Sequence, residues 1–125
     1  SICELKNNMM LRNLAEFVKE TFNVVNVRVV GDLQKKVNRI AILPGSGKSY
    51  IKKAINEKVD VLITGDIDYH SAVDALEEGI CIIDAGHFDT EHFFVEYMHN
   101  YLQSKLETEG IKVCMATEKS PFIII

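Results

Sequence analysis

The sequence predicts an α/β fold whose sheet is mainly parallel or mixed and carries helices on both faces. Short apolar, β-branched segments alternate with amphipathic segments of about ten residues. Such alternation produces βαβ crossovers, which place strands in parallel. A chain of 125 residues fits one domain, so we predict a single α/β domain over residues 1–125.

The amino-terminal part predicts one helix and one strand. Apolar residues recur at helical spacing over residues 10–22, with charged residues between them. Residues 27–30 are mostly valine and end at the turn signal Gly31-Asp32, which favours a short strand.

The remaining segments follow the same rules: apolar runs predict strands, spacing of three and four predicts helices, and Gly79 and Gly110 are typical helix ends. We expect strands at 38–43, 59–64, 80–83 and 111–115, helices at 49–57, 69–78 and 90–107, and a further edge strand at 122–125.

Charge and composition exclude several classes of protein. The chain carries 14 Lys and Arg against 18 Asp and Glu, a net charge of −4 without any basic run, so nucleic acid is not an expected partner. It contains no apolar stretch of about 18 residues that would span a membrane. Cys3, Cys81 and Cys114 are odd in number and widely spaced, which predicts free thiols and a cytoplasmic location.

Three segments follow predicted strands: residues 44–49, 65–70 and 84–91. Ligands of parallel sheets bind at the carboxyl ends of the strands, so these segments are the candidate site. The first resembles a phosphate-binding loop at Gly47-Lys48-Ser49, but that motif needs a glycine where this chain has Ile42. A tight turn, or a helix start that binds an anion, are the other interpretations.

The third segment contains His87 and Glu91, four residues apart at a predicted strand-to-helix boundary. This spacing can bring an imidazole and a carboxylate to one side of a helical turn, where they would suit zinc, manganese or iron. Two ligands do not complete a site. The alternative is that both residues only cap the loop and the helix.

The second segment contains Asp66 and His70, also at the carboxyl end of a strand. His70 could transfer protons, or the pair could orient a metal ligand. The alternative is that Asp66 or Asp68 caps the helix and His70 faces solvent.

Two of these segments carry a pattern that resembles a known family. They read Asp-Ala-Gly-His-Phe-Asp-Thr-Glu at 84–91 and Thr-Gly-Asp-Ile-Asp-Tyr-His-Ser-Ala-Val-Asp-Ala at 64–75. Together with Gly-Ser-Gly at 45–47 and Pro-Phe at 121–122, they resemble the Nif-three-like family of dinuclear metal-centre proteins, also described as GTP cyclohydrolase I type 2 homologues.

This resemblance implies that the chain is the carboxyl-terminal domain of a longer protein. Family members hold two metal ions between two halves, with an adjacent pair of histidines and an aspartate from the amino-terminal half. This chain lacks adjacent histidines, and the resemblance assigns it the other pair of ligands, His87 and Glu91. We therefore expect weak or no metal binding by this chain alone.

The resemblance further implies a homo-oligomer, hexameric in full-length members, and metal-activated water as the reagent. Asp66 and His70 become candidates for proton transfer or for orienting a metal ligand. The predicted function is metal-dependent hydrolysis of a nucleotide-like or phosphorylated small molecule, similar to a GTP cyclohydrolase by resemblance only. Two alternatives stay open: an oligomeric scaffold that metal stabilises, and a phosphate-loop nucleotide enzyme that would need Lys48.

Overall fold

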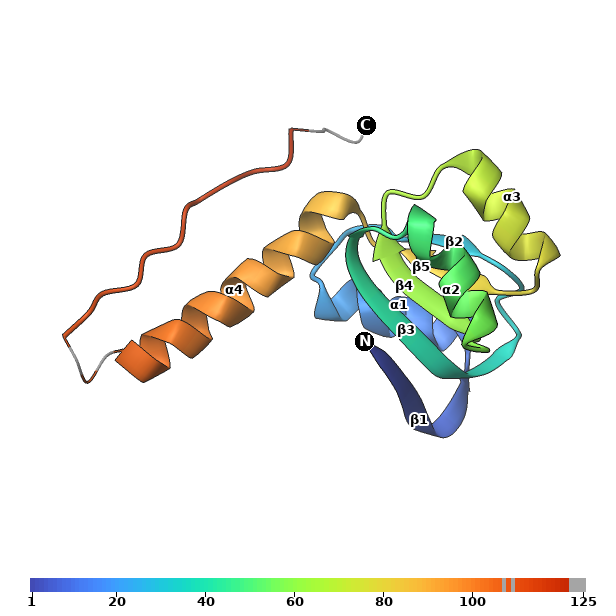
Figure 1. Cartoon of the computed structure of the whole chain (residues 1–125), viewed down its shortest axis with the longest axis horizontal. Coiled ribbons are helices and arrows are strands. Elements are labelled where there is room, and N and C mark those ends of the chain that lie inside the picture. The colour runs from blue at the N-terminus through green and yellow to red at the C-terminus, as the bar shows by residue number, and fades with distance from the viewer. Residues whose placement is uncertain (107, 109, 122–125) are drawn as a thin grey trace.

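One mixed sheet organises the domain (Figure 1). The computed structural model describes residues 1–106, 108 and 110–121. The elements in chain order are β1 (Ile2–Met10), α1 (Leu11–Thr21), β2 (Arg28–Val30), β3 (Lys36–Ser46), the 3-10 helix η1 (Lys48–Tyr50), α2 (Ile51–Asn56), β4 (Val61–Gly65), α3 (Tyr69–Glu77), β5 (Cys81–Asp84) and α4 (His87–Leu106).

The strand order is β1-β3-β4-β5-β2. The three central strands β3, β4 and β5 run parallel, whereas β1 and β2 are antiparallel strands at the two sides. Ser46 pairs with Gly65, and Thr64 pairs with Asp84, so the central strands end together. The structure thereby confirms the α/β fold with a mixed sheet, and it brings the three predicted loops to one end of that sheet.

Alternate residues of the central strands face opposite layers of helices. Val61 and Ile63 face the cluster that α1 closes, whereas Leu62 faces the cluster formed with α2 and α3. All three side chains are buried. Because strands buried on both faces need apolar side chains at every position, they read as continuous apolar runs. Helices therefore cover both faces, as the sequence predicts.

Strand β1 is the element that the sequence analysis missed. Most of its residues are exposed, so its pattern of charged and polar residues gives no strand signal. Its pairing with β3 holds it in place: Ser1 donates from its amino group to the Ile42 carbonyl oxygen at 3.0 Å, and Arg39 Nη1 lies 2.6 Å from Glu4 Oε1. Long-range pairing, and not local preference, makes this strand.

Two other expectations need correction. Strand β3 continues through Pro44 to Ser46, where a loop was expected, with an irregular register that accommodates a residue without an N–H group. The expected strand at 111–115 is absent, because that segment pairs with α4: the Val113 N–H donates to Gln103 Oε1 at 3.1 Å. The expected strand at 122–125 lies outside the described residues.

Helix α4 begins at His87, three residues before the predicted start. After its first turns it leaves the sheet and projects away from the body of the domain (Figure 1). Among the helices that the structure describes, none is long and apolar enough to cross a membrane.

Candidate metal-binding site

His87 and Glu91 form a close pair in the first turn of α4. His87 Nε2 lies 3.1 Å from Glu91 Oε1, and both side chains are about half exposed. Because α4 begins at His87, the two residues stand one turn apart on the same helix face. An imidazole nitrogen and a carboxylate oxygen at this separation can bind one divalent ion together.

Asp66 approaches the same imidazole from the other side. Its Oδ2 lies 3.6 Å from His87 Nδ1, which is within ion-pair distance but longer than a hydrogen bond. Histidines that bind a metal through one ring nitrogen commonly have a carboxylate near the other, and Asp66 occupies that place beside Nδ1. Asp66, which the sequence groups with His70, lies beside His87 in the structure.

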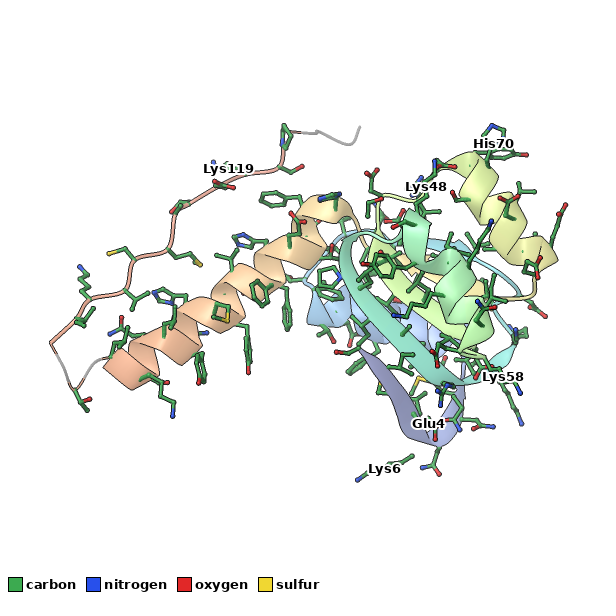
Figure 2. All side chains as sticks on the ribbon, in the orientation of Figure 1. Glu4, Lys6, Lys48, Lys58, His70 and Lys119 are labelled. Atoms are coloured by element: carbon green, nitrogen blue, oxygen red, sulfur yellow. The ribbon has the colours of Figure 1, made fainter. Side chains whose placement is uncertain are left out.

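His70 lies on the first turn of α3 and is exposed. Its ring makes an edge contact with the neighbouring Tyr69, with the ring centres 5.8 Å apart. Figure 2 shows His70 on the outer side of the domain, where it points away from the sheet. The structure thus separates the two residues that the sequence grouped.

The Gly-Ser-Gly segment forms one wall of the site. A Cβ atom at Gly45 would lie 2.8 Å from Glu91 Oε1 and 3.5 Å from His87 Nε2, so only glycine leaves the pair accessible. Two buried hydroxyls hold this segment: the Gly45 N–H donates to Thr90 Oγ1 at 3.1 Å, and Thr64 Oγ1 donates to the Gly45 carbonyl at 2.9 Å. No local pattern in the sequence predicts the contact between this loop and Glu91.

Lys48 contacts a helix cap. Its Nζ lies 2.6 Å from Asp68 Oδ2, and Asp68 caps α3 by accepting the Ser71 N–H at 2.9 Å. The hydrogen bond from Lys48 lowers the pKa of Asp68 to about 2, and the bond to Asp68 raises the pKa of Lys48. Lys48 is therefore paired with a carboxylate of the chain. In a phosphate-binding loop the lysine would instead contact the bound phosphates. The cap at Asp68 agrees with the alternative given for this segment, in which an aspartate caps the helix and His70 faces solvent.

The donor set fits half of a metal site. His87 and Glu91 offer two ligands, whereas catalytic zinc takes three from protein. Among the residues that the structure describes, no three His, Cys, Asp or Glu side chains are grouped so that they could hold a metal ion. A metal bound here would therefore need ligands from outside the described chain.

Comparison with known proteins identifies the family. A family model described as Duf34/NIF3 (NGG1p interacting factor 3) matches residues 1–121. The chain belongs to the DUF34/NIF3 family. This confirms the resemblance that the motifs around Asp66 and His87 indicated.

Similar proteins and solved structures agree with this assignment. A GTP cyclohydrolase 1 type 2 homolog from Clostridium acetobutylicum is 41% identical over 110 residues, which cover 88% of this chain and 41% of that protein. The crystal structure of a Bacillus cereus protein related to NIF3 has a TM-score of 0.89 at 35% identity, covering 99% of this chain and 35% of the other. A Staphylococcus aureus hypothetical protein has a TM-score of 0.88 at 35% identity, covering 99% of this chain and 42% of the other. The chain spans less than half the length of these proteins.

Proposed function

We propose that this domain supplies His87 and Glu91 to a dinuclear metal centre completed by another part of a longer protein. The observation that carries the proposal is the 3.1 Å pair of His87 Nε2 and Glu91 Oε1 at the carboxyl ends of the parallel strands. Asp66 on the opposite ring nitrogen supports it, because a carboxylate behind a histidine is a common feature of metal sites.

The proposed activity is hydrolysis of a nucleotide-like or phosphorylated small molecule. Two divalent ions, zinc, manganese or iron, would supply Lewis-acid activation of water when bound. His87 and Glu91 would hold the ions, Asp66 lies beside the other ring nitrogen of His87, and Gly45 leaves open space beside Glu91. His70 remains a candidate proton carrier only for a substrate that reaches α3.

The experiment is elemental analysis of the longer protein that carries this domain. We expect about two metal ions per subunit, as dinuclear hydrolases hold. His87→Ala and Glu91→Ala should each lower this content. The chain itself offers a matched control: His92 and Glu96 form a second pair on α4, 3.5 Å apart. His92→Ala and Glu96→Ala should leave the metal content unchanged.

Equal metal content in all four variants would contradict the proposal. Where metal is lost only with the first pair, the purified protein is then incubated with GTP and with phosphorylated small molecules. Release of product that stops on metal removal supports the hydrolase.

The alternative function is a scaffold that metal ions hold together without catalysis. The exposed apolar side of α4 favours this candidate: Phe94, Tyr97 and Tyr101 are 56%, 61% and 49% exposed. An apolar cavity of about 540 Å³ lies at the base of the same helix, next to α1 and β1. Metal-dependent assembly in light scattering, with every hydrolysis assay negative, would support the scaffold.

The remaining expectations belong to the same proposal. We place the protein in the cytoplasm, because Cys3, Cys81 and Cys114 are all free thiols. We also expect a homo-oligomer, hexameric in the full-length protein, and little metal binding by this domain alone. Size-exclusion chromatography with light scattering, performed with and without metal, tests the assembly.

A further inference from the structure

Asp84, the last residue of β5, binds both loops of the candidate site. Its side chain is buried, with 4% exposed. Oδ1 accepts the N–H groups of Asp66 at 3.1 Å and Gly86 at 3.0 Å. Oδ2 accepts the Ile67 N–H at 2.9 Å and also pairs with the Arg28 guanidinium. All of these donors come from loops at the carboxyl ends of the strands or from β2.

These bonds fix the direction of the residues that approach His87. Asp66 has a φ of +60°, a left-handed conformation that few residues other than glycine adopt. The bond from its N–H to Asp84 holds that conformation, in which the Asp66 carboxylate faces His87 Nδ1. Gly86 has a φ of +86° and directly precedes α4, so its bond to Asp84 also fixes where His87 begins the helix.

The two loops are in close backbone contact. A Cβ atom at Gly65 would lie 2.5 Å from the Gly86 carbonyl carbon and 2.6 Å from the His87 nitrogen. The backbone before Asp66 therefore touches the backbone that begins α4. Neither loop can shift without displacing the other, and Asp84 is the carboxylate that receives N–H groups from both.

We propose that Asp84 is a positioning residue for the metal ligand His87. It acts through the backbone of Asp66 and Gly86 and does not itself reach His87. The metal-ligand part of this inference rests on the proposed function. The positioning of Asp66 and Gly86 by Asp84 rests only on the hydrogen bonds described above. Asparagine cannot replace Asp84 in this role, because its amide group would turn an N–H₂ toward two N–H donors.

A second carboxylate of the chain, Asp60, accepts backbone N–H groups away from the candidate site. Asp60 Oδ2 accepts the N–H groups of Asn38 and Arg39, both at 2.9 Å, at the amino-terminal end of the central strands. Asp60 precedes β4 and lies at the opposite end of that strand from Gly65. Asp60→Asn is thus the same chemical change, also at a carboxylate that accepts two backbone N–H groups, far from the candidate site.

The experiment compares the 125-residue wild-type chain with its Asp84→Asn and Asp60→Asn variants. Zn²⁺ is titrated to millimolar concentration, and NMR follows His87 and Glu91 while thermal unfolding is recorded separately. The coupling between the amide and Cα protons of Asp66 reports its φ. We expect Asp84→Asn to unfold at a lower temperature, and Asp60→Asn to unfold closer to wild type, because the amide oxygen there can still accept both N–H groups. Only Asp84→Asn should change the Asp66 coupling and weaken Zn²⁺ binding at His87, by about 10-fold or more.

The outcomes separate this inference from the proposed function. An unchanged Asp66 coupling in Asp84→Asn, or the same Zn²⁺ midpoint as Asp60→Asn, overturns the positioning role. If even the wild-type chain shows no Zn²⁺ response at His87, the Asp66 coupling and the His87 shifts decide the positioning role. The metal content of the longer protein decides the proposed function separately. Should Asp84→Asn not fold, Arg28→Gln removes one partner of Asp84, and a smaller change in the same readouts is expected.

Discussion

The two ends of the central strands use the same structural devices for different purposes. Each end has a carboxylate that accepts backbone N–H groups, Asp84 at one and Asp60 at the other. Each also has a residue other than glycine in the left-handed conformation, Asp66 with φ +60° and Lys58 with φ +54°. Figure 2 shows Lys58 at the opposite end of the domain from Lys48 and His70.

The difference lies in what these devices support. At the carboxyl end they hold a half-exposed imidazole between two carboxylates. At the amino end Asp60 joins the start of β4 to β3 through the N–H groups of Asn38 and Arg39. A hydrogen-bonded carboxylate or a left-handed residue is therefore no evidence of function by itself. The neighbouring side chains, here His87 and Glu91, are what indicate a site.

The largest effect is expected at the closest backbone contact. Gly65→Ala would place a methyl group 2.5 Å from the Gly86 carbonyl oxygen, and backbone on both sides cannot yield without moving His87. We expect the free energy of unfolding to fall by about 3 kcal/mol, together with loss of Zn²⁺ binding. Urea denaturation measures the first effect and NMR the second.

Gly79 supplies the control at the other end of the sheet. A Cβ atom there meets nothing within 4 Å, although φ is +75°. Gly79→Ala should therefore cost only conformational strain, about 1 kcal/mol, and leave Zn²⁺ binding unchanged. Equal destabilisation by the two substitutions would contradict the close contact at Gly65.

The next effect concerns a buried hydroxyl. Thr64→Val removes the donor to the Gly45 carbonyl and leaves that oxygen without its buried partner. We expect a loss of about 2 kcal/mol in unfolding free energy, and faster amide exchange at Gly45 because the segment beside Glu91 loosens. Thr21→Val is the control, since that exposed hydroxyl only bonds the Phe17 carbonyl within α1. A change within about 0.5 kcal/mol is expected there.

A smaller effect of opposite sign is expected at the left-handed residues. Lys58→Gly should raise the free energy of unfolding by up to about 1 kcal/mol, because glycine adopts this conformation without strain. Asp66→Gly should gain less, about 0.5 kcal/mol, since aspartate tolerates it better. Only Asp66→Gly should weaken Zn²⁺ binding, because it removes the carboxylate at His87 Nδ1. Weaker binding in both variants would contradict the comparison.

The smallest effect is confined to one titration. The pKa of Asp68 is lowered to about 2 by Lys48, so its stabilising contribution is complete above pH 3.8 and disappears as the pH falls through about 2. In Lys48→Met this pKa should rise toward 3.8 but stay below it, because the Ser71 N–H bond remains. Carbon NMR of the Asp68 carboxyl group measures the shift. An unchanged pKa would show that the ion pair does not form in solution.

Much of the fold was predictable from the sequence because its signals are local. Apolar runs indicated β4 and β5, helical spacing indicated α1 and α3, and the rule for parallel strands grouped the three loops. Strand β1 was missed because its exposed residues carry no apolar alternation. The strand expected at 111–115 was wrong because an apolar run gives no information about its partner.

The candidate site was predictable only in part, for a similar reason. His87 and Glu91 are four residues apart, so their pairing follows from helix geometry. Gly45 and Glu91 are brought together by the packing of distant segments, and so are Asp66 and His87. No local pattern encodes such contacts. His70 was grouped with Asp66 by proximity in the sequence, whereas Asp66 lies beside His87 and His70 is exposed on α3.

The bonds to Asp84 also have a consequence for the timing of motion. The amide protons of Asp66, Ile67 and Gly86 all end on one carboxylate, although they belong to two separate loops. They cannot be released one at a time without leaving the buried carboxylate short of donors. Their exchange with deuterium should therefore follow a single opening event, with one shared free energy of opening. The loop that follows β4 and the loop that follows β5 should therefore open together.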